Sequence, residues 1–216
     1  MGSYTLIMGG NAANSGIGDV TGIVTRTSIV ANTLYTFGNP YTSIIFPNIG
    51  TLPTSLSLKI AIGTAPSWRT GAINRTYDFI QTGASGTKAV IQAHYLDTEL
   101  NGNNETKLVD WSYIVASSTT LEQGRSNYNT TENWVQLTNV NVGLYFTGTF
   151  GQVLLTLDES ATGSLTWNGS FSNSWTTAAN WTPNATPSDF TVVYIPDAAT
   201  TPNDPTLNPS VLLGSL

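Results

Sequence analysis

Hydrophobic and polar residues alternate in short runs along most of this chain. In the clearest run, at 56–62, Leu56, Leu58, Ile60 and Ile62 fall on one face of an extended segment. Such period-two alternation is typical of a strand with one buried face. Comparable runs predict further strands at 21–30, 41–46, 76–81, 88–96, 108–115, 140–146 and 151–157.

Turn-forming residues separate these runs, as at Gly38-Asn39-Pro40, Pro47-Asn48 and Asn101-Gly102. No long segment shows the 3.6-residue period of an amphipathic helix. Short strands at regular spacing between such turns are typical of antiparallel sandwiches. We therefore expect an all-β protein built on an antiparallel β-sandwich, with a small barrel as the main alternative.

The residue composition of the chain changes near Leu165. Three tryptophans, Trp167, Trp175 and Trp181, follow within a short stretch, and six of the ten prolines lie from Pro183 onward. We interpret residues 1–17 as the end of a preceding β unit and residues 18–162 as the sandwich module. Residues 163–216 then form the start of the next repeat-like unit, a truncated β segment rich in Trp and Pro.

The amino-acid composition limits the classes of function that we expect for this chain. Thr, Ser and Asn supply 34, 20 and 20 of the 216 residues, against 20 charged residues, one His and no Cys. Thr favours strands, and Asn and Ser favour turns. Because most active sites draw on clustered carboxylates, His, Cys or Lys, we expect no catalytic residues and no enzyme. The absence of Cys excludes disulfides and Cys-based zinc sites.

The net charge of −6 rests on only seven basic residues, which are dispersed along the chain. A basic stripe that would neutralise phosphates is missing, so we expect no nucleic-acid partner. No run of 18 apolar residues occurs, so we expect no insertion into a membrane. Residues 1–8 lack the features of a signal peptide, and we expect the chain to be part of a longer exported protein.

Three stretches carry a resemblance to a known group of proteins. The runs from Gly18 to Arg26, from Tyr35 to Pro40 and from His94 to Asn103 resemble a β-sandwich module of large repeat-rich secreted cell-surface proteins of Bacteroidota. The tail, with Trp167-Asn168-Gly169 and Asn180-Trp181, is similar to the opening of the next repeat in such chains.

The resemblance covers essentially the whole chain and implies an adhesin-like protein at the cell surface. It further implies export, often by the type IX route through a sorting domain that is not among these residues. Neighbouring modules of the same parent chain would be its partners. The expected function is therefore that of a structural and adhesive module.

The acidic run Asp97-Thr98-Glu99-Leu100-Asn101-Gly102 is the sharpest local motif. Oxygen ligands on alternate residues before a Gly are typical of calcium loops, because calcium takes six to eight oxygens. The candidate metal ligands are Asp97, Glu99, Asn101 and Glu105. Leu108 stands where an EF-hand needs its final Glu, so no cofactor is expected unless this loop holds calcium. A plain Asn-Gly turn is the alternative.

Aromatic residues suggest a second kind of site. Sugar rings stack on exposed aromatic faces, and the candidate ligand-binding residues are Trp68, Trp111, Tyr113 and Trp134. Packing in the core is the alternative for each of them, and Trp111 and Tyr113 alternate so that they share one strand face. These residues raise the alternative function of a carbohydrate-binding module with extracellular polysaccharide as its partner.

A glycoside hydrolase is the least favoured alternative. It requires two carboxyl groups across a cleft, for which the candidates are Asp97, Glu99, Asp110 and Glu122. No spacing selects a pair among them, and His94, the only His, has no recognisable catalytic companions.

Overall fold

The computed structural model describes residues 5–10, 12–14, 16–148, 151–160, 165–182, 184–187, 193–196 and 201–206. It confirms the all-β prediction. Contacts divide the chain into two compact units, one of Met1–Leu121 and Arg125–Glu159, the other of Glu122–Gly124 and Ser160–Leu216. The described residues contain no helix that is long and apolar enough to cross a membrane.

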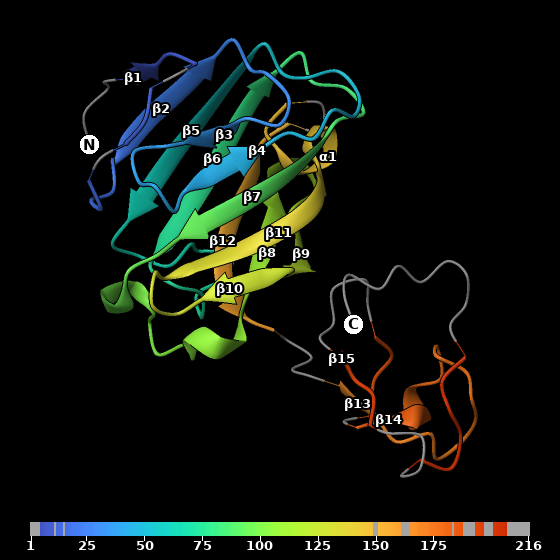
Figure 1. The fold of residues 1–216 in the computed structure, drawn as a ribbon. Coiled ribbons are helices and arrows are strands. Elements are labelled where there is room, and N and C mark those ends of the chain that lie inside the picture. The colour runs from blue at the N-terminus through green and yellow to red at the C-terminus, as the bar shows by residue number, and fades with distance from the viewer. Residues whose placement is uncertain are drawn as a thin grey trace. The chain divides into compact units, whose positions relative to one another are not determined.

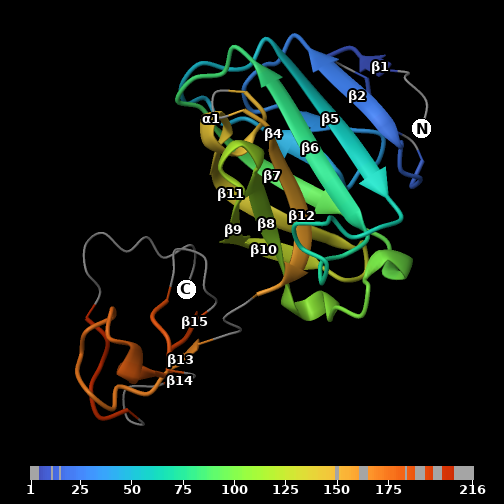
Figure 2. The ribbon, with the colours of Figure 1, turned by 180° about the vertical axis from the view of Figure 1, so that it is seen from behind.

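Two sheets face each other in the first unit (Figure 1). The larger sheet, seen in front in Figure 2, has seven strands in the order β1 (Thr5–Met8), β2 (Gly22–Thr27), β5 (Ser55–Ile62), β6 (Arg75–Thr82), β12 (Val153–Glu159), β8 (Leu108–Ile114) and β9 (Thr119–Gly124). The smaller sheet has five, in the order β10 (Asn127–Asn129), β11 (Trp134–Asn141), β7 (Lys88–His94), β4 (Ser43–Ile45) and β3 (Leu34–Thr36).

The core lies between these sheets and follows the period-two pattern. Leu56, Leu58 and Ile60 on β5 are fully buried against residues such as Ile91 on β7 and Val135 on β11. Burying one such side chain contributes about 1.5–3 kcal/mol. The expected antiparallel sandwich is therefore confirmed, because the inward faces of both sheets are apolar and close over one another.

One predicted strand is wrong. The alternation at 140–146 predicted a strand, whereas β11 ends at Asn141 and a one-turn helix, α1 (Val142–Tyr145), follows. Val142 and Phe146 are both completely buried and are joined by the Phe146 N–H bonding the Val142 carbonyl at 3.2 Å. Residues four apart share a helix face, so one helical turn buries both side chains.

The N-terminal segment packs onto the sandwich. β1 pairs in parallel with β2, and Met8 joins the core. The buried Arg26 guanidinium donates to the carbonyls of Gly9 at 2.9 Å and Ala12 at 2.8 Å. Residues 5–10 and 12–14, which we expected to end a preceding unit, are thus held by the first unit itself.

The second unit has its own core of tryptophans. Strands β14 (Trp181–Thr182), β13 (Leu165–Trp167) and β15 (Val193–Tyr194) form a three-stranded sheet, and η4 (Ala178–Asn180) is a single 3₁₀ turn. Trp181 meets Trp167 and Trp175 edge to face, with ring centroids 5.0 and 4.8 Å apart. Asn180, completely buried, joins the backbone of the segment around Ser172 to this core through four hydrogen bonds.

Candidate functional site

Three of the four aromatic candidates lie together on the outer face of the seven-stranded sheet. Trp111 and Tyr113 share the face of β8 opposite Asp110 and Ser112, because Leu108, two residues before Asp110, points into the core. The loop between β5 and β6 folds over them. The sequence correctly placed Trp111 and Tyr113 on one strand face.

The loop side chains cover both rings. Trp68 stacks on Tyr113 with centroids 5.1 Å apart and an angle of 8° between the rings. The Arg69 guanidinium lies 3.3 Å above the Trp111 ring and its Nε is 2.6 Å from Oδ2 of Asp158. Trp111 is consequently only 6% exposed. This cluster is a packed layer, and it presents no open row of aromatic faces.

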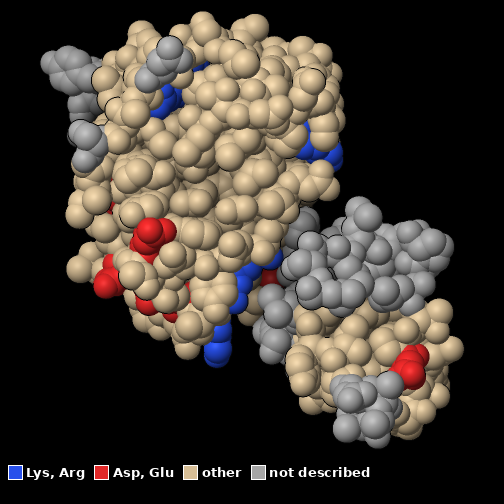
Figure 3. All heavy atoms as spheres, in the orientation of Figure 1, with Lys and Arg blue, Asp and Glu red and all other residues tan. Residues whose placement is uncertain are grey.

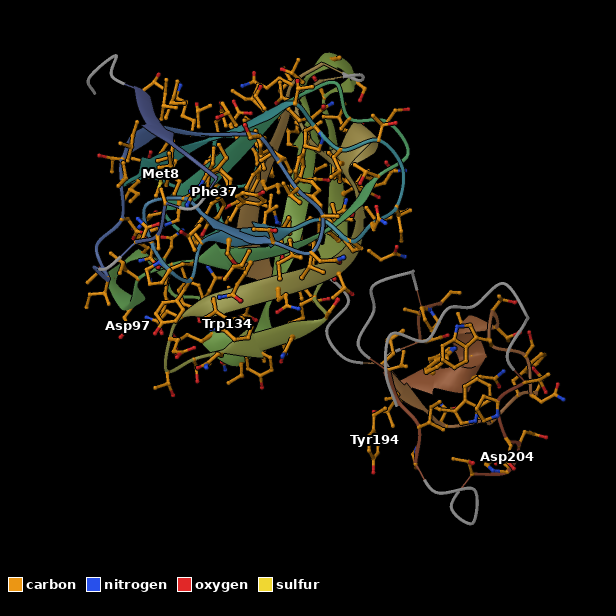
Figure 4. All side chains as sticks on the ribbon, turned by 45° about the horizontal axis from the view of Figure 1, so that its top comes forward. Met8, Phe37, Asp97, Trp134, Tyr194 and Asp204 are labelled. Carbon is orange, nitrogen blue, oxygen red and sulfur yellow. The ribbon has the colours of Figure 1, made fainter. Side chains whose placement is uncertain are left out.

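Trp134 stands apart on the outer face of the five-stranded sheet, where Figure 4 labels it on β11. Its cross-strand neighbour is His94 on β7. The indole N–H donates to Oε2 of Glu132 at 3.0 Å. The Tyr41 ring lies 6.0 Å from the His94 ring, and its hydroxyl hydrogen-bonds Glu132, whose charge raises the pKa of Tyr41. Glu132 therefore holds two half-buried aromatic side chains on one surface.

The predicted metal ligands have other partners. Glu99 is buried and ion-paired with Arg75, whereas Asp97 accepts a hydrogen bond from the Asn133 amide. Asn101 donates to the carbonyl of Ala72 at 2.9 Å, and Glu105 hydrogen-bonds Tyr95, where burial and this carboxylate raise the pKa of the Tyr95 hydroxyl. Nowhere in the described residues do three His, Cys, Asp or Glu side chains gather closely enough to hold a metal ion.

The Asn-Gly turn is present, but it joins two 3₁₀ turns, η1 (Asp97–Glu99) and η2 (Glu105–Lys107), instead of two strands. Asn101 and Gly102 have φ values of 53° and 86°. These left-handed conformations are the ones that Asn and Gly adopt at low cost. The segment is therefore a compact connection between β7 and β8.

A buried ionic network, which the sequence reasoning missed, lies beside this connection. Arg75 on β6 contacts Glu99 through Nε–Oε2 at 2.7 Å and Asp19 through Nη2–Oδ2 at 2.6 Å. The other Asp19 oxygen is 3.2 Å from Nδ1 of His94. Burial acts to raise the pKa of Asp19, but hydrogen bonds from His94 and Arg75 outweigh it and lower that pKa to about 2.

The sequence contains one indication of this buried ionic network. Arg75, Tyr77 and Phe79 alternate on the inward face of β6, so a charged residue occupies a core position and must find an opposite charge. The partners come from distant segments, the stretch before β2 and η1. Pattern reasoning identifies the unusual Arg but not its two carboxylates.

Asp110 is a second buried acid. Its side chain faces the core from β8 and is completely buried, and neither carboxylate oxygen has a hydrogen-bond partner among the residues that the structure describes. Burial raises its pKa well above the ordinary value, because the charged carboxylate would lose its hydration in the core. Two of the four acids considered for a glycosidase, Glu99 and Asp110, are thus shut away from solvent.

Comparisons of the chain with protein-family models, with curated proteins and with solved structures found no significant match.

Proposed function

We propose that this chain is a non-enzymatic structural and adhesive module of a large secreted bacterial surface protein. The observation that carries the proposal is that side chains suited to chemistry are used for packing. Glu99 is bound to Arg75, Asp110 faces the core, and Trp111 lies beneath Arg69. Acidic and aromatic side chains that make ion pairs and packing contacts stiffen the fold. A stiff module is suited to bearing load and to displaying a surface.

The modular construction supports the same proposal. Each compact unit has its own apolar core, a sandwich core in the first and a tryptophan core in the second. Units with separate cores can follow one another along a chain without sharing contacts. Neighbouring modules of the parent chain are then the natural partners.

Composition supports a place outside the cell. With 74 Thr, Ser and Asn residues and 20 charged ones, the surface interacts with water chiefly through neutral hydroxyl and amide groups. The absence of Cys makes the chain indifferent to an oxidising environment. We therefore assign the module to the cell surface.

Labelling of intact cells tests the location. Antibodies raised against residues 18–162 should label intact cells that produce the parent protein, and brief protease treatment of those cells should remove the signal. Labelling that appears only after the cells are permeabilised would contradict the proposal. Purified protein should release no reducing sugar from polysaccharides, and measurable release would contradict the non-enzymatic part.

The proposal gives the segment 97–105 a structural role instead of a calcium role. The melting temperature should then be the same in excess calcium and in excess chelator. A rise of several degrees with calcium that disappears in Asp97→Asn would restore the metal site that the motif suggested.

A further inference from the structure

The outer face of the five-stranded sheet carries a group of aromatic and amide side chains that lie outside the hydrophobic core. We call it the outer-face patch; it consists of Tyr41, Gln92, Asn127, Trp134 and Gln136. The neighbours of these residues along β7 and β11, such as Ile91 and Val135, point into the core. Because side chains alternate along a strand, Gln92, Trp134 and Gln136 point away from the core.

The amides of the patch form a row across three strands. Gln92 on β7 lies opposite Gln136 on β11, which lies opposite Asn127 on β10. Neighbouring strands are about 4.8 Å apart, so the row spans about 10 Å. Among the described residues, the side-chain amides of Gln92 and Gln136 have no hydrogen-bond partner, although neither residue is fully exposed. Each of these two Gln amides offers both donors and an acceptor, whereas the Asn127 oxygen already accepts the Tyr128 N–H at 2.9 Å and leaves its NH₂ group as the donor.

Two aromatic side chains border this row. Trp134 lies two residues before Gln136 on the same face of β11, about 7 Å away along the strand. Glu132 accepts from the Trp134 indole at 3.0 Å and also hydrogen-bonds Tyr41. The two rings are therefore fixed before any ligand arrives, which reduces the entropy lost on binding.

The five side chains of the patch are uncharged, but a negative charge borders them. His94 is paired with Asp19, whereas Glu132 keeps its charge while it accepts hydrogen bonds from Trp134 and Asn129. Figure 3 shows the face that carries β3, β4, β7 and β11 as an uncharged expanse, with acidic side chains near one end and basic ones at the margins. The Glu132 charge would repel an anionic partner, whereas uncharged hydroxyl groups match amides well.

We propose that the outer-face patch binds an uncharged polysaccharide, with Trp134 and Tyr41 stacking on sugar rings and Gln92, Gln136 and Asn127 hydrogen-bonding sugar hydroxyls. Sugar rings combine an apolar face with a rim of hydroxyls, which corresponds to aromatic rings beside a row of amides. This inference rests on the adhesive part of the proposed function. Of the four ligand-binding residues predicted from the sequence, the proposed site retains only Trp134. The other residues of the outer-face patch take the place of Trp68, Trp111 and Tyr113, which pack together on the other sheet.

The test is fluorescence titration and affinity electrophoresis of the whole chain with soluble dextran, mannan, galactomannan and hydroxyethyl cellulose, with alginate as an anionic control. We expect saturable binding to at least one uncharged polysaccharide and none to alginate. Trp134→Ala should weaken that binding at least tenfold. The matched control is Trp68→Ala, which removes a half-buried tryptophan of the loop between β5 and β6 that stacks on Tyr113 of the other sheet, and it should change the affinity less than twofold.

A second variant protects the test against misfolding. Gln92→Ala combined with Gln136→Ala leaves the core and both rings in place and should also weaken binding at least tenfold. Unchanged affinity in Trp134→Ala or in the double Gln variant would overturn the proposal, as would preference for alginate or no binding to any uncharged polysaccharide. A dimer of the wild type that dissociates in Trp134→Ala would mark the patch as a contact between copies and overturn it too.

These outcomes can be separated from failure of the proposed function. Labelling of intact cells without polysaccharide binding would leave a surface module with no glycan site. Binding without labelling of intact cells would leave the glycan site and remove the surface location.

Discussion

Arg75 and Glu99 form a two-point ion pair inside the first unit. Arg75 Nε lies 2.7 Å from Glu99 Oε2, Arg75 Nη2 lies 3.0 Å from Glu99 Oε1, and neither side chain is more than 5% exposed. The pair joins β6 to η1, and Glu99 also accepts the Leu96 N–H at 3.1 Å. The connection between β7 and β8 is therefore anchored by a charge that lies inside the fold.

Removing this buried charge should be costly. Glu99→Gln keeps the shape of the side chain but leaves Arg75 with Asp19 as its only anionic partner. We expect the free energy of unfolding to fall by about 3–5 kcal/mol, because a buried cation loses half of its compensation. Urea denaturation measures this difference.

The matched control for that variant is Glu159→Gln. Glu159 pairs with Lys107 at 3.8 Å across a largely exposed contact, so its loss should change stability by less than about 1 kcal/mol. Equal effects of the two substitutions would contradict the structural role assigned to Glu99.

The low pKa of Asp19 predicts how stability depends on pH. Its folded pKa of about 2 lies below its ordinary value of 3.8. The contribution of Asp19 is therefore fully present above about pH 4 and is lost as the pH falls toward 2. Comparing wild type with Asp19→Asn by denaturation should give a difference at pH 5 that shrinks as the pH falls below 4. A difference that grows in acid would contradict the assignment.

Asp110 should make stability depend on pH in the opposite direction from Asp19. Because its folded pKa is raised, the unfolded chain ionises above the ordinary value of 3.8 while the folded protein does not. Its contribution to stability is therefore greatest in acid and falls as the pH rises. Asp110→Asn has no carboxyl to ionise, so it should be more stable than the wild type at pH 7, and this difference should shrink toward pH 4.

Thermal unfolding of Asp110→Asn at several pH values measures this effect. The control is Asp97→Asn, which changes an exposed acid and should not stabilise the protein at pH 7. A loss of stability in Asp110→Asn at every pH would mean that the Asp110 carboxylate has a favourable partner.

Asn180 should matter only to the second unit. Its side chain accepts the N–H groups of Phe171 and Ser172 and donates to Ser172 Oγ and the Ser174 carbonyl, all at 2.8–3.0 Å. Asn180→Ala leaves these partly buried groups without the Asn180 partner, at a cost of up to about 1–3 kcal/mol for each group left unsatisfied. Hydrogen exchange followed by mass spectrometry should show faster exchange in 165–182 and unchanged exchange in β5 and β6.

Asn173→Ala is the control for that substitution, because Asn173 is exposed and lies in the same segment. It should leave exchange in 165–182 close to that of the wild type. Faster exchange throughout β5 and β6 in Asn180→Ala would contradict the division into units with separate cores.

Two segments show where the hydrophobic pattern of the sequence predicts secondary structure correctly and where it does not. The inward face of β5 was readable because Leu56, Leu58 and Ile60 alternate with polar residues. The same alternation failed at 140–146, where Val142 and Phe146 fit a strand face and a helix face equally well. The bulge between Leu137 and Val140, with Asn139 at a φ of 59°, disrupts the ladder shortly before α1 begins.

The sequence by itself determined the all-β class, the faces of the main strands and the poverty in catalytic groups, since these follow from local alternation and from composition. Only the tertiary structure decided which of the candidate functional side chains are buried by packing or ion pairing and which remain exposed. Trp111 and Trp134 both read as candidate ligands, yet Arg69 covers one while the other stands on an open face. Glu99 read as a metal ligand and instead meets Arg75, 24 positions away. Such outcomes depend on contacts between distant segments, which local pattern does not encode.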